Sequence, residues 1–569
     1  MFFQKLIAKL HPKKKKIWRW ILIAIVAFFA LLVLIVELSV GELGDLGVRK
    51  ITGFPFSKNY LVVFQNDAER RPTGGFITSF ATLKFRFGIP FFQFGNVYDE
   101  KLIQKETSPP DPFVEDLLAG DFYPGHGFRD GNLDPDFPTS ARELIRLYQL
   151  GYPEAEFDGV IAIDFTAFQN LAEELSPEIG GPAGLFAALE NQIQNIDLHD
   201  PEQIQDRKNF LGDVAKNLIK KIILHPKASS SVLLESLNSK HILFYFLDSD
   251  IEATVLAKNW GGALPAPVDS DLLAIVEGNY GGMKSSRYIT RDIFYDIEFS
   301  EDAEQGLTAT AKLKIQLAHR GDAAEPISGY YKSVWRVFTP LGSQKISGTL
   351  DQIFDDGSRK VFTKTIEMNP GESREINFSY LLPESTVQDN IYNLKLVKQS
   401  GSSADHVRVT VKLPAGFLLA SDDFDARENL AIFETNLDSD KDLALRIIPD
   451  TQPPRLAWQE FIGRNLATID LRFNEPLDLD SIKSATFSLA DMNYRNQRFD
   501  SVKIRRAIFI PPQDVWIEVS GVTPECREWY ELRFNGIADQ HGNFLRDQKV
   551  TVVQWIDEFG QNCDPNREL

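Results

Sequence analysis

The pattern of apolar and polar positions along the chain changes character three times. Residues 17–40 are apolar almost throughout, and they are long enough for a helix to cross about 30 Å of hydrocarbon. Residues 50–290 alternate apolar runs of strand length with helical periodicity, which favours an α/β layer structure. Residues 291–450 and 452–556 carry short alternating runs separated by turn residues. This pattern is typical of all-β sandwiches, so we predict a multidomain chain with one transmembrane helix, an α/β domain and two sandwiches.

Within the α/β domain, buried strands are predicted at residues 60–64, 160–163 and 241–247. The clearest helix begins with the capping box Ser140-x-x-Glu143 and places Arg142 on its exposed face. In the sandwiches we expect strands at residues 307–317, 407–411, 466–473, 515–519 and 530–534, with a linker at 450–454.

The N-terminal segment combines positive charge with the apolar run. Residues 1–36 carry seven basic residues and no acidic one, and residues 1–16 form a basic tail that we expect to remain in the cytoplasm. A cleaved secretory signal is the alternative, since residues 39–41 form a small-x-small site, but the apolar run exceeds a usual signal core. We therefore expect a single-pass protein of the cell membrane whose bulk is extracytoplasmic.

Charge and cysteine content exclude several functional classes. The chain of 569 residues has a net charge of −19, and after residue 36 it has 54 basic and 80 acidic residues, a net charge of −26. A general nucleic-acid binder needs a basic face, so nucleic acid is not an expected partner. The two cysteines, Cys526 and Cys563, exclude a Cys-based zinc ribbon, and either one disulfide or two thiols fits the sequence.

Residues 66–76 (NDAERRPTGGF) are the first candidate site. Arg70, Arg71, the Thr73 hydroxyl and two adjacent glycines follow a predicted strand, and such a turn can bring cations and backbone N–H groups to one anion. Residues 49–86 contain seven basic and two acidic residues in an otherwise acidic region. The structural alternative is a Gly-Gly turn whose arginines pair with Asp67 and Glu69.

Residues 128–138 (FRDGNLDPDFP) are the second candidate site. Arg129 stands beside Asp130, with Asp134 and Asp136 close behind, so an anion clamp and hard-metal ligands occur within a few residues. Magnesium with a phosphorylated substrate suits such a group. The alternative is an aspartate-rich turn with solvated charges.

Three long motifs carry a resemblance to a known family. Residues 59–80 (NYLVVFQNDAERRPTGGFITSF), 129–144 and 157–171 resemble bacterial domain-of-unknown-function family 4012, and the pieces at 260–265, 276–289 and 329–343 extend the resemblance to about residue 415. The family has no established activity. More remotely, the same order of pieces is similar to the LytR/CpsA/Psr group, which moves glycopolymers from polyprenyl-pyrophosphate carriers to the cell wall with magnesium.

The resemblance to that group implies specific roles. Arg71 matches the arginine of its Arg-Thr-Asp motif, and Arg129 and Asp130 match its Arg-Asp pair, which implies catalytic roles for these three residues. Arg70, Arg142 and Thr73 would then bind substrate, and Asp130 with Asp67 would hold Mg²⁺. The sequence departs from the group at Thr73, where the group has a metal-linked aspartate, and at Phe128, where it has proline.

The C-terminal domain resembles the Ig-like repeats of bacterial surface proteins in residues 471–481 and 530–545. Two functional hypotheses follow. The first is an anchored envelope protein that binds or transfers a polyprenyl-pyrophosphate-linked glycopolymer or another cell-wall polymer, for which Arg71, Arg129, Asp130 and Arg142 must converge. The second is a non-catalytic surface or adhesion protein with Ig-like spacers.

Overall fold

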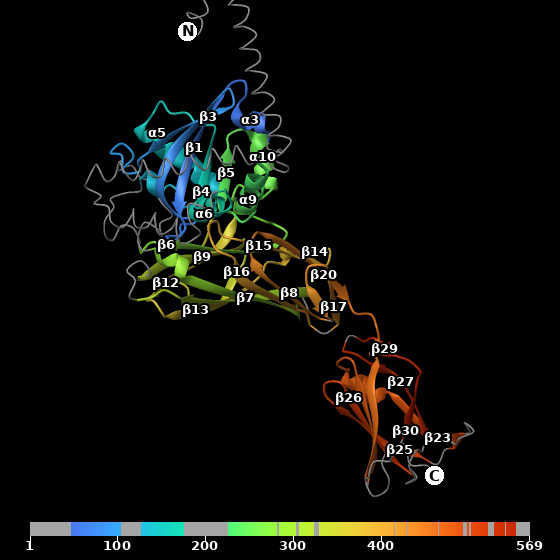
Figure 1. Ribbon diagram of the computed structural model, residues 1–569. Coiled ribbons are helices and arrows are strands. Elements are labelled where there is room, and N and C mark those ends of the chain that lie inside the picture. Colours follow the sequence, from blue (N-terminus) through green and yellow to red (C-terminus); the bar gives the residue numbers. More distant parts are fainter. Residues whose placement is uncertain are drawn as a thin grey trace, which may run out of the picture.

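The computed structural model describes three bodies in chain order: an α/β layer, a large β-sandwich and a smaller pair of β-sheets (Figure 1). It describes residues 47–103, 127–175, 226–281, 284–302, 306–323, 329–414, 416–427, 429–464, 466–492, 498–499, 502–521, 529–540 and 542–553. The predicted tail at 1–16, the predicted anchor at 17–40, Cys526 and Cys563 lie outside these residues. Within the described ranges, no helix has the length and apolar character needed to span a bilayer.

The α/β layer contains a five-stranded sheet in the order β3-β2-β1-β4-β5. β1 and β4 run parallel, and the other neighbours are antiparallel. The three predicted strands of this domain are confirmed as β1, β4 and β5. The bounds are β1 Ser57–Asn66, β2 Phe76–Arg86, β3 Ile89–Gly95, β4 Gly159–Asp164 and β5 Ile242–Phe246.

Helices cover both faces of this sheet because its strands are apolar on both sides. One face packs on α5, and the other packs on α6, α9 and α10. Two short 3-10 turns, η2 and η4, and the short helix α3 complete the layer. The bounds are α3 Val48–Thr52, η2 Phe128–Asp130, α5 Phe137–Gly151, α6 Phe165–Leu175, α9 Pro226–Asn238, α10 Ser249–Ala257 and η4 Lys284–Tyr288.

The large sandwich consists of two sheets that enclose one apolar core. The first sheet has the order β10-β13-β8-β7-β16-β19-β18, with bounds Gln344–Gly348, Ser373–Leu381, Gly306–His319, Ile289–Asp302, Asp405–Lys412, Leu430–Leu437 and Asp425–Arg427. The second has the order β11-β12-β9-β6-β15-β20-β17, with bounds Gln352–Asp355, Arg359–Met368, Tyr331–Pro340, Asp271–Asn279, Ile391–Val397, Lys441–Pro449 and Phe417–Ala420. β14 (Val387–Gln388) pairs with β15, and η6 (Glu384–Thr386) precedes it.

Strand β6 belongs to this sandwich although it precedes residue 290, the predicted end of the α/β domain. It pairs antiparallel with β9 and parallel with β15, whose residues follow it by about 60 and 120 positions. All nine of its residues are buried. The sheet change therefore occurs near Asp271, because β6 finds its hydrogen-bond partners in the sandwich rather than beside β5.

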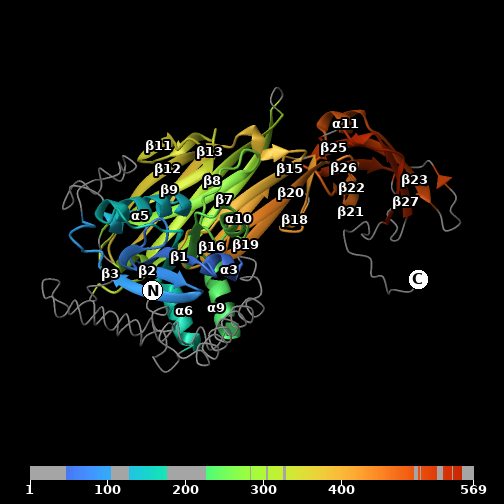
Figure 2. The ribbon, with the colours of Figure 1, turned by 90° about the horizontal axis from the view of Figure 1, so that it is seen from above.

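The C-terminal body has two four-stranded sheets around a core that includes Ile469, Val515 and Leu532. Its family-level assignment as Ig-like remains a prediction. The bounds are β21 Leu456–Arg464, β22 Leu466–Phe473, β26 Asp514–Ser520 and β25 Lys503–Ile510 in one sheet, β24 Arg498–Phe499, β23 Thr486–Met492, β27 Trp529–Asn535 and β30 Gln548–Val553 in the other, with α11 Leu479–Ser484 and the pair β28 Ile537–Ala538 and β29 Phe544–Leu545. Figures 1 and 2 both place these sheets beyond the β20 end of the sandwich.

Candidate anion-binding site

The turn that follows β1 connects the α/β layer to the sandwich. Its backbone is closed by hydrogen bonds from Gly74 N to the Arg71 carbonyl (2.9 Å) and from Phe76 N to the Glu69 carbonyl (2.9 Å). Gly75 N donates to the Gln65 side chain (3.2 Å), and a Cβ at Gly75 would lie 2.2 Å from the Asn66 carbonyl. The absence of a side chain at Gly75 therefore permits its backbone to approach that of Asn66 closely. The N–H groups of Gly74 and Gly75 both donate to protein acceptors and not to an anion.

Arg70 lies in the interface between the two bodies and not in a ligand site. Its Nη1 donates to Glu277 of β6 at 2.9 Å, and both side chains are buried. Arg291 of β7 contacts the same Glu277 oxygen at 3.5 Å and donates to Asp405 at 2.5 Å. The Arg70 guanidinium neutralises a buried carboxylate of the sandwich, and its predicted substrate-binding role stays a prediction.

Arg71 and Arg129 meet on the ring of Phe76. The Arg71 guanidinium lies 5.4 Å from the ring centroid and the Arg129 guanidinium 5.9 Å from it. Arg71 also lies over Tyr280 at 4.9 Å and donates through Nη1 to the Asn279 carbonyl. Cations favour such aromatic faces, and the two centroid distances place the guanidinium carbons of these two distant segments at most about 11 Å apart.

Two carboxylates accompany these cations. Asp130 lies 3.6 Å from Arg129 Nε, and Glu69 lies 3.3 Å from Arg71 Nη2. Burial raises the pKa of Glu69, Arg71 lowers it, Asp130 raises it, and Lys284 and Arg129 lower it. Lys284 is thus a third cation of the group, and the sequence analysis assigned it no role. We call Glu69, Arg71, Arg129, Asp130 and Lys284 the Arg71–Arg129 cluster.

Arg142 does not join this cluster. It lies 5.8 Å from the ring of Tyr245 on β5 and donates to Thr139 at 3.0 Å. Phe76 opens β2, and β1 and β4 separate β2 from β5, so three strand spacings of about 4.8 Å stand between the two positions. The expected convergence therefore holds for Arg71, Arg129 and Asp130, and it fails for Arg142.

Thr73, Asp134 and Asp136 have structural positions. The Thr73 hydroxyl is buried and accepts from Gln65 Nε2 at 3.4 Å. Asp136 caps the N-terminus of α5 by accepting from Thr139 N at 3.1 Å, and Asp134 accepts from Asp136 N at 2.8 Å. Asp134 thus stabilises the turn and Asp136 caps the helix, which agrees with the structural alternative to a hard-metal site.

Asp67 lies in a second group of titratable side chains with Asp164 and His241, whose ligand atoms lie within 4.8 Å of one another. His241 Nδ1 is 2.6 Å from Asp164 Oδ2, and the Thr166 hydroxyl donates to Asp67. Burial, and after it the nearby Asp164, raises the pKa of Asp67 to about 6.

Asp130 is not a member of this group. The structure therefore separates the two predicted magnesium ligands into different clusters, and they do not fit one ion. The sequence has no local signal for the second group, because its three residues lie at the ends of three different strands. Asp67 follows β1, Asp164 ends β4 and His241 precedes β5.

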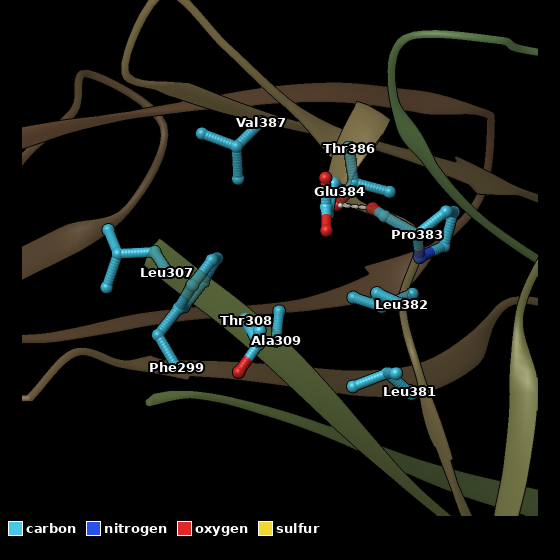
Figure 3. A pocket seen from close by; sticks show the side chains of 10 residues that line it. All are labelled: Phe299, Leu307, Thr308, Ala309, Leu381, Leu382, Pro383, Glu384, Thr386 and Val387. Carbon is cyan, nitrogen blue, oxygen red and sulfur yellow. Dashed lines mark hydrogen bonds between the residues drawn. The ribbon is translucent and has the colours of Figure 1, made fainter. Parts of the chain in front are cut away.

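A small pocket in the sandwich is unrelated to either group. Phe299, Leu307 and Val387 line it on one side and Pro383 and Leu382 on the other (Figure 3). Its volume of about 40 Å³ is close to that of a single water molecule. It is too small to hold a polymer or a lipid carrier.

The comparisons with known proteins cover part of the chain. Residues 57–180 match the family described as "Protein of unknown function (DUF4012)". This supports the predicted resemblance in the α/β layer and leaves its extension to residue 415 a prediction. No curated protein matches the chain. Among solved structures, a proposed nutrient-binding protein from Legionella pneumophila shares 10% identity, covers 28% of this chain and 67% of its own, and superposes with a TM-score of 0.19, so it carries no argument.

Proposed function

We propose that this chain is a membrane-anchored extracytoplasmic protein of the cell envelope whose α/β layer binds a diphosphate group at the Arg71–Arg129 cluster. The observation that carries the proposal is the pair of guanidinium groups on the single Phe76 ring. Arginine forms bidentate bonds with phosphate, and two arginines near one point can bind the two phosphates of one ligand. In its specific form the ligand is a polyprenyl-pyrophosphate-linked glycopolymer.

The charges and hydrogen bonds of the cluster support an anionic ligand. Among the described residues of the cluster, Arg71, Arg129 and Lys284 oppose the two carboxylates Glu69 and Asp130, so these five side chains carry one more positive than negative charge. The buried Nε of Arg71 has no hydrogen-bond partner among the described residues. Because a buried donor without an acceptor is unfavourable, a ligand oxygen at this position would improve the site.

Transfer of the polymer is an extension of this proposal. Arg71 and Arg129 would stabilise the charge that develops on a leaving diphosphate. Magnesium would supply further charge stabilisation in such a reaction. Asp130 lies in the cluster with Glu69, whereas Asp67 lies with Asp164 and His241, so we assign no step to a metal ion.

Replacing Arg129 with alanine should weaken the binding of inorganic pyrophosphate to the full-length chain at least tenfold, because charge-assisted bonds to phosphate are lost. Arg129 is the better choice than Arg71, since Arg71 also donates to the sandwich backbone. The matched control is Arg142→Ala, whose guanidinium lies over Tyr245, and its affinity should remain within twofold of wild type. Calorimetric titration in detergent at low salt measures both. Equal effects of the two variants, or no binding by wild type, would refute the site.

The identity of the ligand requires a separate measurement. Extraction of the purified full-length chain and mass spectrometry of its lipids should detect a polyprenyl phosphate in wild type and less of it in Arg129→Ala. Pyrophosphate binding without any co-purified lipid would point to a free or polymeric phosphate instead.

The second candidate function is a non-catalytic surface or adhesion protein with spacer domains. The specific observation in its favour is that Arg70 and Arg71 both bond to residues of β6. In this view the arginines fasten the α/β layer to the sandwich. The same titration decides between the two, because a scaffold has no reason to lose pyrophosphate affinity on changing Arg129 alone.

A further inference from the structure

An exposed aromatic and basic surface lies at one end of the α/β sheet. Among the described residues, Phe56, Phe87 and Phe91 are 81%, 68% and 53% exposed. They are neighbours, since Phe87 N donates to the Phe56 carbonyl at 3.2 Å and Phe91 pairs with Lys84 across β2 and β3. With side chains of this size, the exposed apolar area is on the order of 400 Å², comparable with the largest patch on a typical monomer. We call Phe56, Lys84, Arg86, Phe87, Ile89 and Phe91 the hairpin patch.

The turn at the tip of this hairpin has an unfavourable residue for its geometry. β2 and β3 are joined by Phe87 and Gly88 alone, with φ of 51° and 77°. A two-residue turn with two positive φ angles favours Asn-Gly, and a bulky residue is rare at the first position. Phe87 therefore adds strain to the turn and exposes a large apolar ring, which indicates a function outside the folded core.

The charge of the hairpin is also distinctive. Residues 76–95, which form β2, the turn and β3, contain the two basic residues Lys84 and Arg86 and no aspartate or glutamate, in a chain with 80 acidic residues. Lys84 and Arg86 lie opposite Phe91 and Ile89 in the register, so basic and apolar side chains share one face. Arg86 lies 6.0 Å from the Phe91 ring centroid. Exposed aromatic rings with basic groups and no acid are typical of surfaces that contact anionic membranes.

The position of the patch along the chain favours a bilayer over other partners. The predicted anchor ends at residue 40, and Gly47, the residue before α3, follows seven residues later. A chain of seven residues spans at most about 24 Å, so Gly47 lies within that distance of the predicted end of the anchor. Phe56 follows only nine residues later, and its carbonyl bonds to the hairpin tip. Figure 1 shows α3 and β3 at the end of the molecule opposite the sandwich.

We propose that the hairpin patch contacts the surface of an anionic lipid bilayer and thereby orients the α/β layer against the membrane. The inference rests on the membrane anchor of the proposed function and adds a second, peripheral contact to it. The aromatic rings of Phe56, Phe87 and Phe91 would lie among the headgroups, and Lys84 and Arg86 would pair with lipid phosphates. The Arg71–Arg129 cluster lies at the other end of β2, about 30 Å away along the strand. In this orientation a polyprenyl-pyrophosphate would have to leave the bilayer surface to reach the cluster, whereas a free or polymeric diphosphate would not.

Photo-crosslinking tests this contact on the full-length chain. Benzoylphenylalanine placed at Phe91 is compared with the same residue at Phe544 of the C-terminal body, which is also 53% exposed. In vesicles of phosphatidylglycerol and phosphatidylcholine, we expect at least fivefold more lipid adduct from position 91, detected by mass spectrometry. Equal adduct yields at the two positions, or a crosslinked dimer of the chain in place of lipid adducts, would overturn the proposal.

The variant Phe87→Asn separates lipid contact from folding. Asparagine fits the turn, so the thermal midpoint should stay the same or rise, while the lipid adduct at position 91 should fall by at least half. An unchanged adduct yield would contradict a role for Phe87. Pyrophosphate affinity should stay at the wild-type value in Phe87→Asn, and the adduct yield should stay unchanged in Arg129→Ala, so failure of either proposal is recognisable without the other.

Discussion

Replacing Glu277 with alanine should lower the free energy of unfolding of the sandwich by about 3–5 kcal/mol, because the change leaves buried guanidinium groups without their carboxylate. Glu277 is fully buried on β6, where it accepts from Arg70 at 2.9 Å and lies 3.5 Å from Arg291. Arg291 keeps Asp405, whereas Arg70 has no second carboxylate among its described ion pairs. The measurement is urea denaturation of the full-length chain, with hydrogen exchange of the peptide that contains β6.

The matched control for this change is Glu298→Ala in the same sandwich. Glu298 pairs with Lys312 at a similar distance of 2.9 Å, but both side chains are half exposed. Exposed pairs contribute about 0–1 kcal/mol, so the control should shift the urea midpoint little. A similar, small loss in both variants would mean that Arg70 does not depend on Glu277 for its burial.

The Arg70–Arg71 turn contributes side chains to two places, the interface with the sandwich and the Arg71–Arg129 cluster. Arg70 belongs to the interface, Arg71 belongs to both the interface and the cluster, and Arg129 belongs to the cluster. The two adjacent arginines thus both bond to β6, Arg70 to the Glu277 carboxylate and Arg71 to the Asn279 carbonyl, and Arg71 in addition lies over the Phe76 ring. Loss of stability at Glu277 and loss of affinity at Arg129 would separate these two roles by experiment.

The local elements of the fold could be predicted from the sequence. Residues 60–64, 307–317 and 466–473 are apolar or alternating runs, and each lies in a strand that the structure confirms as β1, β8 and β22. The helix at α5 was predicted with its start at Ser140, but it begins at Phe137 after the cap Asp136. Asp, Ser and Thr are all good caps, so the local pattern alone left two starting points.

The non-local contacts could not be predicted from the same patterns. β6 lies within the residues predicted as the α/β domain, and only its pairing with β9 and β15 places it in the sandwich. The partners of Arg70 and Arg71 lie more than 200 residues away. Periodicity and capping report on a few turns of chain, whereas these contacts depend on which sheet a strand joins.

Only part of the candidate site could be predicted, because its residues come from segments that are distant in the sequence. The resemblance selected Arg71, Arg129 and Asp130, which do meet, although they lie in separate segments. It also selected Asp67, which instead lies beside Asp164 and His241. Lys284 could not be assigned to the site from the sequence, because its proximity to Glu69 follows from the packing of η4 against the Arg70–Arg71 turn.

Asp271 should give the sandwich an unusual dependence of stability on pH. This carboxylate begins β6 inside the core, where it accepts from Tyr392 at 2.5 Å, from Tyr295 at 2.7 Å and from Leu272 N at 2.7 Å. Burial raises the pKa of Asp271 to about 6, and the three hydrogen bonds oppose the rise. Among the described residues, the groups that stabilise the charged form are the Tyr392 and Tyr295 hydroxyls and the Leu272 backbone N–H, and none of them is a lysine or arginine.

Because the folded protein keeps the Asp271 proton to a higher pH than the unfolded chain, its contribution is full below about pH 4 and is lost as the pH rises to about 6. The loss should be about 3 kcal/mol in the free energy of unfolding, and it should be constant above that window. The variant Asp271→Asn has no proton to lose, so the stability difference between wild type and variant should fall by that amount between pH 4 and 7. Denaturation at a series of pH values measures the difference, and any constant offset from the lost hydrogen bond cancels.

The variant Tyr392→Phe tests the cause of the shift. The Tyr392 hydroxyl lowers the pKa of Asp271 by stabilising its charged form, so its removal should raise that pKa further. The falling limb of the stability profile should then extend to higher pH than in wild type. Parallel profiles for wild type and Asp271→Asn would show that Asp271 has the same pKa in the folded and the unfolded chain, and that the tyrosine hydroxyl groups compensate fully for its burial.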